Sequence, residues 1–194
     1  MKYLTASLLE NLYEQTEQNI SKAIAEWQQL PVDYLTAQPG ENKWSAAQCL
    51  EHLNSYGRYY LPAIEKAIAK AAATKPSVHF KSGWLGNYFY KLMLPENNGT
   101  VKKKMKSPKD HQPGLELNAA KVINEFISQL EVLGRLLTLA RGIDMNASRV
   151  PISISPFIKL KLGDVFLFLT AHINRHVLQA ERALQATATQ VQPG

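Results

Sequence analysis

Four segments of the chain repeat apolar residues with a period near 3.6, the spacing of a helix that buries one face. They cover about residues 4–30, 44–73, 115–140 and 163–184. No segment alternates apolar and polar residues convincingly with the period of two that indicates a strand. The pattern therefore predicts an all-α protein, a bundle of four long helices.

Residues that commonly begin and end helices support these limits. Pro31 ends the first helix, and Gly142 follows the third as a C-terminal stop. Ser45 and Gln48 form a capping-box pattern at the start of the second helix. We expect Pro62 to bend this helix, because proline removes a backbone donor and clashes with the preceding turn.

The connections between the helices differ in length. About 14 residues join the first two helices and about 20 join the last two, whereas roughly 40 separate the second from the third. This crossover is too long for a structureless loop, and residues 84–92 predict a short extra helix within it. A long crossover also lets helices two and three run parallel. Without a repeat or a linker, residues 1–194 are expected to form a single helical bundle domain.

Composition narrows the class of protein. Apolar residues make up 45% and charged residues 20% of the chain, as in ordinary globular proteins. No uninterrupted apolar stretch approaches about 18 residues, so we expect no membrane span. The N-terminal segment turns polar too early for a signal peptide, and the single cysteine fits a reducing compartment. We therefore expect a cytoplasmic protein.

The net charge of +6 is only a weak indication of an anionic partner. The basic run at residues 102–109 lies in the crossover and has no aromatic residues between its lysines. We interpret it as a solvated loop and expect no nucleic-acid partner.

Two histidines on the fourth predicted helix carry the clearest chemical signal. His172 and His176 are four residues apart, so their imidazoles project from one face. Two such imidazoles can bind a metal ion, or they can be buried for packing if each finds a hydrogen-bond partner. The same face carries the inward residues Val165, Leu169, Ile173, Val177 and Ala180.

His52 supplies a third inward imidazole, from the second helix, beside the apolar stripe of Cys49, Leu53 and Tyr56. Three protein ligands with a further position left to water or substrate are typical of catalytic metal sites. Ile173 occupies the place of the glutamate in H-E-x-x-H, so the site is not of the zincin type.

The other candidates allow two interpretations each. Cys49 either approaches the metal or is a small core residue, and we favour the core. Gln179 could orient His176, and Arg175 could bind an anion at the mouth or pair on the surface. Aromatic residues could wall a substrate pocket or belong to the core; these are Tyr56, Tyr60, Trp84 and Tyr88.

We expect the two remaining histidines, His79 and His111, to lie in exposed loops. His111 is the better candidate for a pocket role, because residues 110–113 lead towards the third long helix.

Several of these segments resemble one known family. Residues 44–53 (WSAAQCLEHL) resemble the second-helix signature of the DinB/YfiT-like superfamily, tryptophan–serine/threonine followed by histidine–leucine. Leu162-Gly163-Asp164 followed by residues 172–179 (HINRHVLQ) is similar to its fourth-helix signature. Residues 106–108 (KSP) resemble a basic–small–proline element in the crossover of one subgroup.

The resemblance implies a bundle of up-down-down-up topology. It also implies a divalent metal, commonly zinc or nickel, held by His52, His172 and His176. Relatives include enzymes that use low-molecular-weight thiols as S-transferases or thiol-dependent isomerases, and many are dimers, so a homodimer is possible. Fold alone does not license function.

Three neutral imidazoles would leave the metal its full positive charge, which lowers the pKa of a bound thiol or water. The leading hypothesis is a metal-dependent enzyme that transfers a low-molecular-weight thiol to a small electrophilic molecule. A metal-dependent hydrolase that uses bound hydroxide, and a non-enzymatic metal-binding stress-response protein, are the alternatives.

Overall fold

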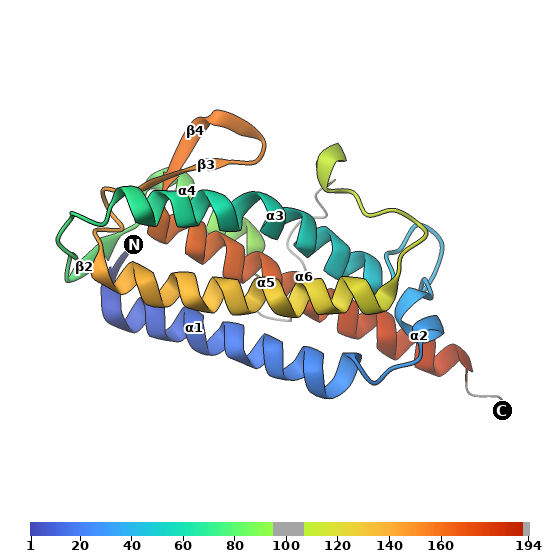
Figure 1. The fold of residues 1–194 in the computed structure, drawn as a ribbon. Helices are drawn as coiled ribbons and strands as arrows, with labels where there is room; N and C mark the ends of the chain where they lie inside the picture. The colour runs from blue at the N-terminus through green and yellow to red at the C-terminus, as the bar shows by residue number, and fades with distance from the viewer. Residues whose placement is uncertain (95–106, 192–194) are drawn as a thin grey trace.

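Four long helices form the body of the protein in the computed structural model, which describes residues 1–94 and 107–191 (Figure 1). The all-α fold class is confirmed. The long helices are α1 (Thr5–Lys22), α3 (Ala46–Lys70), α5 (Ala119–Leu139) and α6 (Leu162–Val191). Figure 1 shows α1 and α6 beginning at the left end of the bundle, whereas α3 and α5 begin at the right end.

The predicted capping box begins α3. The Ser45 hydroxyl accepts the Gln48 N–H at 3.2 Å, and the Gln48 side-chain oxygen accepts the Ser45 N–H at 3.0 Å. The helix then continues through Pro62 to Lys70. The cap therefore fixes where α3 begins and, through it, the position of His52 on the second turn.

Shorter helical elements extend or connect the long ones. A π-helical turn, η1 (Ala23–Trp27), extends α1, and two 3-10 turns are η2 (Lys109–His111) and η3 (Ala140–Gly142). The connection after Pro31 contains α2 (Val32–Thr36). The extra helix predicted in the crossover is present as α4 (Trp84–Met93).

A buried carboxylate on α6 fixes the start of α4. Asp164 accepts the Ser82 hydroxyl at 2.5 Å and the Gly83 N–H at 3.0 Å. Gly86, on the first turn of α4, lies against the same carboxylate so closely that a β-carbon there would be 2.2 Å from its Cγ. These contacts place α4 directly on α6.

The structure contains two small antiparallel sheets that the sequence analysis did not predict. β1 (Lys2–Leu4) pairs with β2 (His79–Lys81), and β3 (Arg149–Ile152) pairs with β4 (Ser155–Lys161). Three of these strands have only three or four residues, and residues 156–159 of β4 are all exposed. Neither case produces the alternation of apolar and polar residues that indicates a strand.

The core lies between the four long helices. Its largest fully buried side chains include Trp27, Leu50, Ile64, Phe126 and Phe166. In the described parts of the chain, none of the helices is both long and apolar enough to cross a bilayer. Of the basic run, residues 102–106 lie outside the described residues.

Candidate metal centre

His52 from α3 and the pair His172 and His176 from α6 meet inside the bundle. The His52 ring centroid lies 5.1 Å from that of His172 and 4.5 Å from that of His176, and the latter two are 4.7 Å apart. Their exposed fractions are only 3%, 4% and 9%. One ring nitrogen from each lies within 4.8 Å of the others, so the group could hold a divalent cation.

Aromatic side chains surround the three imidazoles. The Trp44 ring, just before the α3 cap, lies 5.0 Å from His52 and 5.9 Å from His176. The Tyr56 ring lies 4.4 Å from that of His172, and Phe168 stacks on His172 at 5.6 Å. These rings limit the access of water to the ring nitrogens.

Burial keeps the three histidines neutral. It lowers the pKa of His52 to about 4 and that of His176 to about 3. The pKa of His172 also lies well below its ordinary value, because of burial and the nearby imidazoles. Neutral imidazole is the form that binds a metal, so the histidines are ready to act as ligands near pH 7.

The crossover sets the tautomer of His52. Its Nδ1 lies 2.6 Å from the His111 carbonyl oxygen, which can only accept, so Nδ1 carries the proton. The lone pair is then on Nε2, which faces His172 Nε2 at 3.2 Å. A tetrahedral zinc ion with Zn–N bonds of about 2.05 Å holds two nitrogens about 3.3 Å apart, so this spacing fits a shared cation.

The second ring nitrogens of the α6 pair are less well satisfied. Nδ1 of His172 and Nδ1 of His176 are both buried and find no partner among the described residues. Buried imidazoles kept only for packing are expected to have such partners. Metal-ligating imidazoles are expected to have them too, so these Nδ1 atoms do not separate the two cases. The close approach of the three imidazoles is what favours a cation over simple packing.

His111 is buried, contrary to the expectation that it lies in an exposed loop. His111 is 8% exposed, and its ring centroid lies 3.9 Å from that of Tyr56. Its Nδ1 lies 2.9 Å from the Ser55 hydroxyl, which donates to the His52 carbonyl at 2.7 Å, so His111 Nδ1 is the donor. No sequence pattern pointed to Ser55, and only the direction of residues 110–113 pointed to His111.

The other residues singled out in the sequence lie in different places relative to the histidine cluster. Cys49 belongs to the core, with a fully buried thiol whose pKa burial raises to about 12. Gln179 lies beside His176, where its hydrogen bonding opposes the lowering of the His176 pKa. Arg175 donates to the Leu92 carbonyl at 3.0 Å, at the end of α4.

Of the four aromatic candidates, two are buried near the histidine cluster and two are exposed. Tyr56 and Tyr60 are buried, and Tyr56 contacts the histidines. Trp84 and Tyr88 are 83% and 54% exposed, so they do not belong to the core. His79 is exposed as expected, although it lies in β2 and not in a loop.

Comparison with known proteins gives one result. A family model described as the DinB superfamily matches residues 12–180, a range that includes all three clustered histidines. The searches of curated proteins and of solved structures found no match. Because the family match covers most of its length, the chain belongs to the DinB superfamily.

Proposed function

We propose that this protein is a metal-dependent enzyme that transfers a low-molecular-weight thiol to a small electrophilic molecule. His52, His172 and His176 are the proposed ligands of a divalent cation, zinc or nickel. The observation that carries the proposal is the meeting of three buried, neutral imidazoles from two helices.

The composition of the cluster supports this chemistry. In the described parts of the chain, the group that could hold a metal consists of three histidines, with no carboxylate or thiolate. A bound cation would therefore keep its positive charge and lower the pKa of a thiol beside it, and the thiolate is the reactive nucleophile.

The surrounding residues prepare the site. The His111 carbonyl holds the proton of His52 on Nδ1, which keeps Nε2 free as a ligand. Trp44, Tyr56 and Phe168 shield the imidazoles from water. Cys49 remains a buried neutral thiol in the core, so the reacting thiol would have to come from outside the chain.

In the proposed reaction, a sulfur–carbon bond forms between the thiol and the electrophilic carbon. The thiol loses its proton to solvent, and in a substitution the leaving group departs with the electrons of the bond that breaks. The chain itself contributes the ligands, the orientation of His52 and the dry surroundings.

A conjugation assay tests the proposal. Protein loaded with zinc, nickel or manganese would be mixed with 1-chloro-2,4-dinitrobenzene and with glutathione, cysteine or coenzyme A, and thioether formation followed by absorbance. We expect conjugation that requires metal and falls to background in His172→Ala. The control His79→Ala changes an exposed histidine and should retain full activity.

Other results would contradict thiol transfer. Metal-dependent hydrolysis of 4-nitrophenyl acetate without any thiol would identify a hydrolase. Tight metal binding without turnover of any combination of thiol and electrophile would favour a non-enzymatic metal-binding protein.

A further inference from the structure

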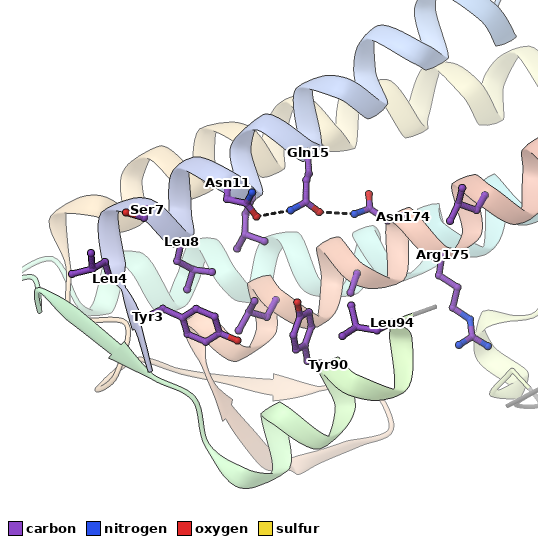
Figure 2. Close-up of a pocket in the computed structure, with 14 residues that line it drawn as sticks. Tyr3, Leu4, Ser7, Leu8, Asn11, Gln15, Tyr90, Leu94, Asn174 and Arg175 are labelled. Atoms are coloured by element: carbon purple, nitrogen blue, oxygen red, sulfur yellow. Dashed lines mark hydrogen bonds between the residues drawn. The ribbon is translucent and has the colours of Figure 1, made fainter. Parts of the chain in front are cut away.

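A cavity of about 390 Å³ lies between α1, α4 and α6, within the size range of small-molecule sites (Figure 2). Its buried wall is apolar and is formed by Leu8 and Leu12 of α1 and by Leu167 and Ala171 of α6. Leu4, which is 55% exposed, lies at its edge. The cavity therefore has an apolar interior that is open to solvent on one side.

The cavity is separate from the histidine cluster. Ala171, Asn174 and Leu178 line it, whereas His172 and His176 point towards α3 from another face of α6. Residues at positions 171, 174 and 178 share one side of a helix. One helix thus contributes to two different sites.

Two phenols supply polar groups inside the cavity. In Figure 2 the hydroxyls of Tyr3 and Tyr90 point towards the space between α1 and α6. The Tyr3 hydroxyl donates only to the Met1 sulfur, a weak acceptor, and no hydrogen bond of the Tyr90 hydroxyl is found within residues 1–94 and 107–191. Burial raises the pKa of both, so both remain neutral phenols that can donate and accept.

A row of amides forms one edge of the cavity. Asn174 donates to Gln15 at 2.6 Å, and Gln15 donates to Asn11 at 2.6 Å (Figure 2). Asn19 completes the row by donating to Asn174 at 2.8 Å. These bonds bridge α1 and α6 with polar side chains in place of close apolar packing, which leaves the adjacent space open.

The charged groups around the cavity limit the charge that its ligand can carry. No carboxylate occurs among the described lining residues, so a buried cation would lack an opposite charge. The positive charge of Arg175 lies at the edge of the cavity, where its guanidinium points away from Tyr3 and Tyr90 and donates to the Leu92 carbonyl (Figure 2). An anion beside the two phenols would therefore be unpaired as well, and burying an unpaired charge is costly. The lining therefore suits an uncharged molecule.

We propose that this cavity binds an uncharged, mainly apolar small molecule whose hydroxyl or carbonyl group hydrogen-bonds to Tyr90 and Tyr3. The site is independent of the proposed metal chemistry, because its residues and those of the histidine cluster do not overlap.

Three probes of eight carbons each test the assignment: 1-octanol, octanoate and octylammonium. Binding would be measured by chemical-shift changes in ¹⁵N-labelled protein, with and without metal. We expect saturable binding of 1-octanol, with shifts in α1, α4 and α6, and weaker binding of both ions. Tyr90→Phe, which removes one oxygen, should weaken 1-octanol binding by about threefold to tenfold. The matched control Tyr88→Phe alters an exposed tyrosine of the same helix and should have no effect.

Two further variants complete the test. Ala171→Trp should fill the cavity and abolish binding, and Tyr90→Phe remains informative if that variant does not fold. His172→Ala should bind 1-octanol normally even where metal binding is lost, which separates this site from the proposed function. Failure of all three probes to bind would overturn the inference. Binding of either ion as tightly as 1-octanol would also overturn it. So would an affinity for 1-octanol that falls as the protein concentration rises, because that would show a second copy of the chain covering the opening.

Discussion

At the scale of single residues, the position of His52 depends on groups far along the chain. The His111 carbonyl accepts its Nδ1 proton, and Ser107 lies 3.4 Å from the same nitrogen. The sequence could predict the three inward histidines, because helical spacing assigns each to a face. It could not predict that Ser55 and His111 support His52, because the contact between them joins residues 56 positions apart in the chain.

Ser55→Ala tests this support. The substitution leaves the buried His111 Nδ1 without its acceptor, which should cost about 1–3 kcal/mol of unfolding free energy. Because His111 orients His52, zinc affinity should fall by about tenfold. Urea unfolding and competition with a chromophoric chelator measure the two effects. Ser128→Ala, at an exposed serine on α5, is the matched control, and equal behaviour of the two variants would contradict the role of Ser55.

At the scale of secondary structure, long amphipathic helices were the predictable part of the fold. The period of 3.6 residues located α1, α3, α5 and α6, and the length of the crossover pointed to α4. The two small sheets were not predictable, because short or exposed strands bury too few residues to leave a pattern. The π-helical turn after α1 continues the same helical pattern and has no separate signal.

The close packing of α4 against α6 leads to a prediction about stability. In Gly86→Ala the new β-carbon would lie 2.2 Å from Asp164 Cγ, so α4 must shift. We expect a loss of about 1–3 kcal/mol in unfolding free energy. Gly142→Ala meets nothing within 4 Å and should change stability by less than about 0.5 kcal/mol. Chemical denaturation of both variants checks this, and a Gly86→Ala protein as stable as Gly142→Ala would disprove the close contact.

At the scale of the whole molecule, the helices hold neutral histidines in a dry interior, and the family match covers residues 12–180. The limits of the domain at residues 1–194, the cytoplasmic location and the possible homodimer stay predictions. The buried cluster nevertheless links stability to pH.

The metal-free protein should lose stability as the pH falls. His52 has a pKa of about 4 in the folded state against an ordinary 6.5, so below pH 6.5 the unfolded chain binds a proton that the folded chain refuses. Because of His52 alone, the free energy of unfolding should fall by about 2 kcal/mol between about pH 6.5 and 5. The decrease levels off once the pH is below the pKa of His52 in the folded state. Urea denaturation from about pH 7.5 to 4 measures it. His52→Ala should make the dependence less steep without abolishing it, because His172 and His176 remain buried, and His79→Ala should leave it unchanged. Stability that is constant over this range would contradict the buried, neutral state.

The most direct test of the metal centre is elemental analysis of the purified, dialysed protein together with its histidine variants. We predict one divalent ion per chain in the wild type and in His79→Ala, and almost none in His52→Ala, His172→Ala or His176→Ala, each shown to be folded by circular dichroism. A wild-type protein that binds no divalent ion after incubation with zinc or nickel, or variants that retain the full metal content, would contradict the account.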